Sequence, residues 1–504
     1  MISPTTPASR RRGLVTAPRI QFVRFPIALS MAQLGVCFAI SALVDLTDDG
    51  DTALAFLLGA AACGVVGGFE LRRVPRPSVT TAPAVMTMAT LAFTVLALGG
   101  AAAHLLADAT DELDTALLEG TAPITTTAMT GLDADGLPRG LLMFRALLQW
   151  MGGLGGLIVA LIVIPLVVGG KELRGRGQSD RGERALIRGR TNGARNVVAV
   201  YLAGSALLGI AYLVAGLGLF DAVGQAMATV STGGLSTRTG SIAAFDSAAV
   251  EWVATVGMAV AGLNLGVVWW AVQRETQALR RSTELRTYLV VMALSIVAVF
   301  LWIDATEPAS IRTAALTVTS AMSTTGFSTS PWWNFDAGAQ MLLLTLIGIG
   351  AMTGSAGGGF RYLRAIQAFG FARRELRRQL HPSAVAVVRV NGKAVQERTL
   401  ERMTGYIVLY VTVVAAGGML IELGDAGVTP SAAIALSVSA LSTAGPQVID
   451  PVDLGSIGTI SKLTLSVLML LGRLSIYAVL LTVINAVVRA GERIEHTMHH
   501  VGDR

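Results

Sequence analysis

Long apolar stretches alternate with short polar ones along most of this chain. A run of about 20 mostly apolar residues can cross the hydrocarbon core of a membrane as a helix. The sequence therefore predicts an all-α membrane protein with many spans. Ten stretches come close to this length or exceed it: 26–44, 52–69, 83–105, 140–169, 197–220, 249–272, 287–303, 338–369, 404–422 and 463–488.

Four shorter apolar stretches lie between the long ones, near 113–124, 221–231, 311–322 and 430–441. Each has roughly 10 to 12 residues, and at about 1.5 Å per residue such a helix cannot cross a core about 30 Å thick. Short helices at membrane depth are tolerated where protein or a water-filled cavity surrounds them. We therefore expect four re-entrant helices.

Composition supports a membrane protein and argues against a soluble enzyme. Charged residues make up 14 % of the chain and hydrophobic residues 53 %, whereas a soluble domain carries about 25 % charged residues. The sequence contains no phosphate-binding loop, paired-carboxylate site or nucleophile–base pairing. We expect no enzymatic activity and no bound cofactor, with an ion as the transported substrate.

The distribution of charge predicts the orientation in the membrane. Cytoplasmic loops of membrane proteins collect Lys and Arg, and ten spans with a cytoplasmic amino terminus place 33 of the 39 basic residues on that side. Acidic residues gather instead in outer segments such as 45–51 and 108–114. Both termini are thus expected in the cytoplasm. The net charge of +6 follows from this topology, so no nucleic-acid partner is expected.

A short motif recurs after each of the four short stretches. An apolar residue is followed by Ser or Thr, then Thr, then a small residue or Thr, and the fifth position is Gly in three copies and Ala128 in the first. Small residues also serve close helix packing in membranes, but four copies at matching places favour a shared role. The copies are ITTTA at 124–128, VSTGG at 230–234, MSTTG at 322–326 and LSTAG at 441–445.

These copies predict four repeats of span, short helix, loop and span around a pseudo-fourfold pore. Two further spans precede the repeats. The expected segments are 1–80 (basic cytoplasmic arm and two additional spans), 81–190 (repeat 1), 191–285 (repeat 2), 286–400 (repeat 3 and a cytoplasmic link), 401–490 (repeat 4) and 491–504 (cytoplasmic tail).

The chemistry of the loops suits a dehydrated cation. Rings of main-chain carbonyl oxygens can replace the water shell of an ion, and glycine lets the backbone adopt dihedral angles closed to other residues. The short helices would direct their negative carboxyl-terminal ends toward the ion. Arg145 and Gln149, near the outer end of a span, are expected to brace these loops rather than to contact ions.

Longer stretches of the chain resemble the Trk/Ktr/HKT superfamily of cation transporters, most closely its Trk-type potassium-uptake membrane subunits. The stretches that carry the resemblance are LPRGLLMFRALLQWMGGLGGLIVALIVIP (137–165), FDSAAVEWVATVGMAVAGLNLG (245–266), GIGAMTGSAGGGFRYLRAIQ (348–367), HPSAVAVVRVNGKAV (381–395) and LSVLMLLGRLSIY (465–477), together with the four loops.

The resemblance implies potassium uptake across a bacterial plasma (inner) membrane, a homodimer, and a cytosolic nucleotide-binding regulatory subunit as partner. It also implies a selectivity filter. By position, the filter residues are Thr126, Thr127, Ala128, Thr232, Gly233, Gly234, Thr324, Thr325, Gly326, Thr443, Ala444 and Gly445.

Two departures from the family pattern leave alternatives open. Potassium-selective relatives carry Gly where this chain has Ala128, so sodium or non-selective cation conduction through the same pore is an alternative function. The last span has Ser475 where relatives commonly carry an acidic residue, which leaves the partner of Arg473 undefined. An ion-coupled secondary transporter of another substrate is a third possibility, although no Asp or Glu lies clearly within a span.

Two features of the later spans predict a gate. Glycine destabilises a helix interior by up to about 1 kcal/mol relative to Ala, so the glycine cluster near 354–359 should interrupt its span. Arg473 lies deep in the last span, where a charge costs about 2.5–3.5 kcal/mol, and is expected to face the pore as an electrostatic barrier. Helix packing and a structurally paired arginine are the alternatives. The gate residues are Gly354, Ser355, Gly357, Gly358, Gly359 and Arg473.

The cytoplasmic link contains one signal for strands. Asn391-Gly392 stands between two runs rich in β-branched residues, and this dipeptide favours the tight turn of a two-residue hairpin. A β-hairpin is therefore predicted within 387–395.

Overall fold

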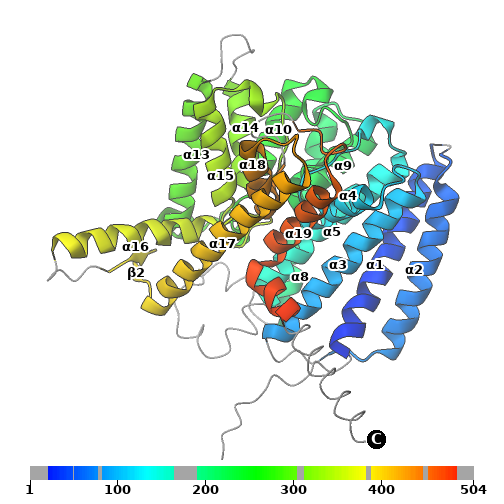
Figure 1. Cartoon of the computed structure of the whole chain (residues 1–504), viewed down its shortest axis with the longest axis horizontal. Helices are drawn as coiled ribbons and strands as arrows, with labels where there is room; N and C mark the ends of the chain where they lie inside the picture. Colours follow the sequence, from blue (N-terminus) through cyan, green and yellow to red (C-terminus); the bar gives the residue numbers. More distant parts are fainter. Residues whose placement is uncertain are drawn as a thin grey trace, which may run out of the picture.

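The computed structural model describes residues 21–48, 50–77, 82–163, 190–302, 311–381, 387–445 and 452–484. The predicted arm up to residue 20, the tail 491–504 and most of the basic segment 171–195 lie outside these residues. The described part of the chain is a bundle of helices with one two-stranded hairpin (Figure 1).

The first two helices form an addition at one side of the bundle. α1 (Gln21–Leu46) and α2 (Ala53–Arg73) pack along each other, and α1 also contacts α3 and α5. The contact is close because glycines face it. A Cβ atom on Gly35 would lie 2.7 Å from the Gly64 backbone nitrogen. This pair matches the two additional spans expected before the repeats (Figure 1).

Each repeat contains a short helix of 12 or 13 residues that follows a longer helix, as the apolar pattern predicts. The short helices all lie toward the upper side of Figure 1. The elements are α3 (Ala82–Leu106), α4 (Leu113–Thr125), α5 (Arg139–Ile158) and η2 (Val159–Val163) in the first repeat; α8 (Arg190–Val214), α9 (Leu219–Ser231), α10 (Ala248–Ala261), α11 (Leu265–Val272) and α12 (Thr276–Arg281) in the second; α13 (Thr283–Trp302), α14 (Ile311–Ser323), α15 (Ala337–Ile349) and α16 (Tyr362–Leu380) in the third; and α17 (Glu397–Gly424), α18 (Pro430–Leu441) and α19 (Thr459–Leu474) in the fourth. Single turns η1 (Ala134–Gly136), η3 (Ala243–Phe245) and η4 (Trp332–Asn334) follow the loops of the first three repeats.

Three of the ten predicted spans are not single helices, and the glycine cluster predicts the interruption of one of them, 338–369. The described residues contain seven helices long and apolar enough to cross a membrane, or up to nine if two bent pairs count as one span each. The stretch 249–272 bends by 106° between α10 and α11, and the stretch 463–488 bends by 110° between α19 and a helix over Ile476–Ile484. In the stretch 338–369, α15 ends at Ile349 and the chain is not helical again until Tyr362.

Local backbone requirements explain these breaks. Gly350 has a φ of +75° and Ser475 a φ of +79°, which lie outside the helical region and are rare for a residue with a side chain. At the first bend the Asn264 side chain accepts a hydrogen bond from the Gly266 N–H (2.7 Å) and so starts a new helix. Apolar composition gives no sign of the bends at Asn264 and Ser475, whereas the glycine cluster predicts the break in the third repeat.

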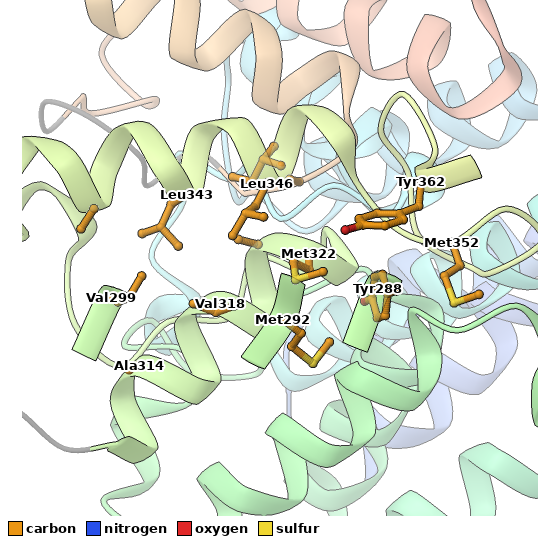
Figure 2. Close-up of a cluster of buried hydrophobic side chains, with 14 of the residues drawn as sticks. Tyr288, Met292, Val299, Ala314, Val318, Met322, Leu343, Leu346, Met352 and Tyr362 are labelled. Carbon is orange, nitrogen blue, oxygen red and sulfur yellow. The ribbon is translucent and has the colours of Figure 1, made fainter. Parts of the chain in front are cut away.

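The third repeat has a compact core that extends into its non-helical segment. Figure 2 shows side chains from α13, α14 and α15 that meet in one apolar cluster, with Met352 and Tyr362 at its edge. The rings of Tyr288 and Tyr362 pack edge to face with centroids 5.3 Å apart. The segment between α15 and α16 is therefore anchored by buried side chains at both ends.

The hairpin predicted around Asn391-Gly392 is confirmed. β1 (Arg389–Val390) pairs with β2 (Lys393–Ala394) in antiparallel register, and Asn391 and Gly392 both have positive φ angles (50° and 74°), as a type I′ turn requires. The Asn391 side chain accepts a hydrogen bond from the Thr283 N–H at the start of α13 (2.7 Å). The helix that precedes the hairpin, α16, projects sideways from the bundle in Figure 1.

Candidate functional site

The four short helices end in the same backbone motif. Thr126, Thr232, Thr324 and Thr443 directly follow or nearly follow the helix ends and are left-handed, with φ angles of 56°, 54°, 58° and 51°. A left-handed residue other than Gly or Asn is uncommon. Its recurrence at four matching positions shows that the repeat seen in the sequence is also a repeat of backbone conformation.

Hydrogen bonds at these ends repeat as well. The Thr126 N–H donates to the Pro123 carbonyl (2.9 Å), and the Thr127 N–H donates to the Ala122 carbonyl (2.8 Å). This pairing is a Schellman motif, which satisfies the last carbonyl groups of a helix. The other three loops form the same two bonds through Thr232 and Gly233, through Thr324 and Thr325, and through Thr443 and Ala444.

The fifth positions of the four motifs converge. A Cβ atom placed on Gly234 would lie 2.9 Å from the Ala128 Cβ, one on Gly326 would lie 2.7 Å from it, and one on Gly445 would lie 3.4 Å from it. The Cβ atom placed on Gly326 would also lie 2.8 Å from the Gly445 nitrogen. The loops that are up to 317 positions apart in the sequence therefore meet around one point, and the Ala128 methyl group lies among the three glycines.

Two side chains hold the first two loops from behind. Gln149 on α5 donates to the Leu235 carbonyl (3.0 Å) and accepts from the Leu235 N–H (3.2 Å). Glu119 on α4 accepts from the Gly131 N–H (2.7 Å) and from the Thr130 hydroxyl (2.8 Å). Both side chains are fully buried. The bracing role expected for Gln149 fits these bonds, whereas Glu119 was not singled out in the sequence.

Glu119 also faces two buried basic side chains. The Arg145 Nη2 lies 3.7 Å from its carboxylate, and the His104 Nε2 lies 4.0 Å from it. Arg145 has two further nitrogens, Nε and Nη1, without a hydrogen-bond partner. The carboxylate is thus the charge that compensates Arg145 behind the first loop.

We expect Glu119→Gln to destabilise the protein. Loss of one member of a buried ion pair typically costs about 3–5 kcal/mol, because the other charge stays buried without compensation. Thermal denaturation in detergent should show a lower midpoint for Glu119→Gln, and the double variant with Arg145→Gln should recover part of the loss. Equal or additive losses in the double variant would contradict a charge coupling between the two residues.

The glycine-rich segment 350–361 is held by hydrogen bonds from several elements. The Met352 N–H donates to the Gly262 carbonyl (3.1 Å), the Leu265 N–H donates to the Gly354 carbonyl (3.1 Å), and the Thr353 N–H donates to the Glu284 carboxylate (2.9 Å). The bend between α10 and α11 therefore lies against one side of this glycine-rich segment and is hydrogen-bonded to it. Asn264, at this bend, donates to the Thr353 carbonyl.

This segment lies directly against the third and fourth loops. The Gly358 N–H donates to the Thr324 hydroxyl (2.7 Å). A Cβ atom on Gly357 would lie 2.5 Å from the Ser323 carbonyl oxygen, and one on Gly358 would collide with the Ser442 carbonyl and the Thr443 hydroxyl. Gly354 and Gly359 instead have positive φ angles of 82° and 83°. The glycines thus permit both a close approach and a sharp turn.

Arg473 bridges this segment to two helices. From α19 its Nη1 donates to the Ala356 carbonyl (2.7 Å) and its Nη2 donates to the Gly152 carbonyl on α5 (2.8 Å). A Cβ atom on Gly156 would lie 2.7 Å from the guanidinium, so this face of α5 has no room for a side chain. The partners of Arg473 are therefore main-chain carbonyl oxygens, and an acidic residue at Ser475 is not required.

A separate polar contact joins the first and fourth repeats outside the loops. The buried Lys462 amino group donates to the Glu112 carboxylate (3.0 Å) and to the Thr115 hydroxyl (2.7 Å). The hydrogen bond from Lys462 lowers the pKa of Glu112, and the hydrogen bond from Thr115 adds to the effect. The start of α19 is thereby fixed to the start of α4.

The structure places the predicted filter residues around one point and the predicted gate residues beside them, but the sequence analysis missed Glu119 and Glu284. Glu119 lies in a stretch interpreted only as an apolar short helix, and Glu284 lies at the start of a span, among charged residues interpreted as a loop. A carboxylate within a short helix at membrane depth is costly unless it is paired, and this signal could have identified Glu119.

Comparisons with known proteins agree on one family. The family model described as TrkH, cation transport protein, matches residues 77–489. The chain is 30 % identical over 375 residues to the Trk system potassium uptake protein TrkH of Escherichia coli (strain K12), which covers 72 % of this chain and 77 % of that relative. It is 31 % identical over 405 residues to the Trk system potassium uptake protein TrkH of Halomonas elongata, and the match covers 78 % of this chain and 83 % of that relative.

A solved structure has the same fold. The crystal structure of the potassium transporter TrkH from Vibrio parahaemolyticus matches with a TM-score of 0.82 at 24 % identity, covering 92 % of this chain and 98 % of that one. The overall arrangement of the helices therefore belongs to a known architecture.

Proposed function

The chain belongs to the TrkH family of membrane cation transport proteins, as its loops and spans predicted, and we propose that it takes up potassium across a bacterial plasma membrane. The ion passes through a filter of main-chain oxygens contributed by the four loops. The relatives are named as potassium uptake proteins, which makes potassium the first candidate substrate.

The convergence of the four loops carries this proposal. A dehydrated alkali-metal cation needs several oxygen atoms around it, and carbonyl groups supply them without binding the ion too tightly to leave. The loops meet within van der Waals distance at Ala128, Gly234, Gly326 and Gly445. Their left-handed threonines turn the backbone sharply after each helix, so the next carbonyl groups can face a common axis.

The short helices add a favourable field. α4, α9, α14 and α18 each end at a loop, and the carboxyl-terminal end of a helix carries a partial negative charge of roughly half an electron. Four such ends near one point would stabilise a cation at membrane depth, where water is scarce.

The segment 350–361 and Arg473 serve as the gate in this proposal. The segment contacts the third and fourth loops and is tied to α19 through the Arg473 guanidinium. A positive charge beside the path opposes the entry of a cation, and movement of the segment would carry it away. The contacts of Gly357 and Gly358 mean that even a small shift changes the space directly next to the loops.

Sodium or non-selective conduction is the second candidate, and Ala128 favours it. Its methyl group lies where the other three loops have only hydrogen atoms. A narrower or less regular ring of oxygens would bind the larger potassium ion less well relative to sodium. The two candidates share one pore and differ only in selectivity.

Ion uptake into vesicles tests the proposal. The full chain, reconstituted in phospholipid vesicles, should admit radioactive rubidium faster than empty vesicles do. Competition by potassium but not by sodium supports the first candidate, and equal competition supports the second. Absence of rubidium and sodium uptake, with correctly folded protein, would contradict both.

Ala128→Gly should sharpen the preference for potassium. Removal of the methyl group restores a fourth glycine at the point of convergence, and a change of about 1.4 kcal/mol in the relative binding of the two ions is a factor of ten. We expect the potassium-to-sodium uptake ratio to rise about tenfold. The control is Ala134→Gly, in the turn after the same loop and outside the converging positions. An unchanged ratio would count against the assignment of Ala128 to the filter.

The family also suggests partners and an orientation for this chain. We propose a homodimer with both termini in the cytoplasm and a cytosolic nucleotide-binding regulatory subunit. The exposed basic surface of α16 (Arg373, Arg377 and Arg378) and the hairpin after it lie in the expected cytoplasmic link. Crosslinking from cysteines introduced on α16 would test whether the regulator docks there.

A further inference from the structure

A long apolar groove opens on the membrane-facing side of the second repeat. It has a volume of about 860 Å³ and lies between α8 and the bent pair α10–α11. That volume falls within the range of about 300–1,000 Å³ typical of small-molecule sites. Its floor includes Val230 of α9, and its inner end reaches Ser355 and Ala356 of the gate segment.

The chemistry of the lining identifies the class of occupant. None of the 24 residues that line the groove is Asp, Glu, Lys, Arg or His. The walls come from helices long and apolar enough to cross a membrane, and large side chains along the opening are strongly exposed, with Leu207 at 69 % and Val272 at 70 %. Hydrocarbon surrounds such a surface in a bilayer, so an acyl chain matches it and water does not.

Basic residues next to the groove add a second requirement for the molecule that binds there. Exposed Arg195 directly precedes the lining residue Asn196, and exposed Arg274 follows the lining residue Val272 by two positions. A phosphate group beside an arginine forms charge-assisted hydrogen bonds. The apolar groove with a basic end thus matches a molecule that joins a hydrocarbon chain to an anionic head group.

We propose that this groove binds one acyl chain of an anionic phospholipid, with its head group at Arg195 and its chain against Ala356. The carbonyl of Ala356 accepts the hydrogen bond from Arg473, so the bound chain touches the segment next to that contact. Any effect on ion flow rests on the proposed function, whereas lipid binding does not.

Filling the groove tests the binding directly. A Cβ atom on Gly204 meets only the Val230 side chain at 3.8 Å, and one on Gly209 of the same helix meets only Ala226 at 3.8 Å, but Gly204 lines the groove and Gly209 does not. Gly204→Leu should therefore occupy the groove, and Gly209→Leu is its matched control. Both changes raise helix propensity equally.

The readout is phospholipid retained by the full-length protein. Protein purified from vesicles of phosphatidylcholine and phosphatidylglycerol is exchanged into detergent, and retained lipid is counted by mass spectrometry. We expect the wild type and Gly209→Leu to keep about one phosphatidylglycerol per chain that Gly204→Leu lacks, and Arg195→Gln to lose the preference for phosphatidylglycerol. Equal lipid in all variants, or a dimer that dissociates in Gly204→Leu without loss of lipid, would overturn the proposal.

A second measurement avoids any variant of the groove glycine. Trp269 lines the groove, whereas Trp270 beside it is buried in the core of the third repeat. Brominated acyl chains quench tryptophan fluorescence on contact, so Trp269→Phe should remove a quenched component in vesicles of brominated phosphatidylglycerol and Trp270→Phe should not. If both variants quench like the wild type, no acyl chain reaches the groove.

Discussion

Gly234→Ala should strongly reduce rubidium uptake. Gly234 has a φ of +68°, a conformation that costs a residue with a Cβ roughly 1–2 kcal/mol. The added Cβ would also collide with the Thr325 carbonyl oxygen and approach the Ala128 methyl group to 2.9 Å. Overpacking of this kind costs typically 1–3 kcal/mol more. Since every 1.4 kcal/mol is a factor of ten, we expect uptake to fall by about a hundredfold.

Gly392→Ala is the matched control for this experiment. Gly392 has a similar φ of +74°, yet nothing lies within 4 Å of the position of its Cβ. Backbone strain is therefore alike in the two variants, and only Gly234→Ala adds a collision between loops. Uptake should stay near the wild-type rate in Gly392→Ala. If Gly234→Ala folds normally and conducts at the wild-type rate, the second and third loops do not form the ion path.

Arg473→Met should increase uptake. Two unit positive charges separated by about 8 Å repel each other by about 2 kcal/mol at an effective dielectric constant of about 20, and Arg473 lies against the proposed gate segment. Methionine also cannot donate hydrogen bonds, so the link from α19 to Ala356 and Gly152 is lost. Removal of both restraints should raise the rate of rubidium uptake by about tenfold or more. The measurement is initial uptake into vesicles of matched protein content.

Arg473→Lys separates the effect of the positive charge from the effect of the two hydrogen bonds to Ala356 and Gly152. Lysine keeps the positive charge but lacks the planar fork that lets arginine bind two acceptors at once. We expect uptake close to the wild type if the charge is the main barrier. Arg364→Met controls for loss of an arginine near the same segment, since Arg364 donates to the Phe360 carbonyl (3.3 Å) and stacks on Tyr406. A decrease in uptake for Arg473→Met in folded protein would refute its role as a barrier.

The repeats could be predicted from local sequence because their signals are local. Each short helix is an apolar run too short to span a membrane, and each ends in Ser or Thr followed by a threonine that takes a left-handed conformation. The Asn391-Gly392 turn is local in the same sense. Such features require only neighbouring residues to form. The predicted and observed bounds of the short helices therefore agree to within two or three residues.

The break in the second-repeat span depends also on residues far apart in the chain. Gly262 and Asn264 end α10 where the backbone of Met352 and Thr353 supplies hydrogen bonds from another repeat. The apolar composition of 249–272 is the same for a straight helix and a bent one. The carbonyl partners of Arg473 come likewise from Gly152 and Ala356, 321 and 117 positions earlier, and main-chain partners leave no trace in the side-chain sequence.

One part of the gate prediction concerns the backbone alone. A dense glycine cluster predicts an interrupted span, and the helix does end at Ile349. Composition does not show that these glycines also allow tight contacts with Ser323 and Ser442. Whether those contacts open during transport is the question that the Arg473 variants address.

The four converging loops belong to one polypeptide, and one of them differs from the other three at its apex. In a homotetramer, every mutation would alter all quadrants of such a ring at once. A tandem arrangement within a single gene lets each quadrant change alone, so evolution can adjust ion preference in steps a quarter as large. In the filter proposed above, the lone methyl group at position 128 is one such step.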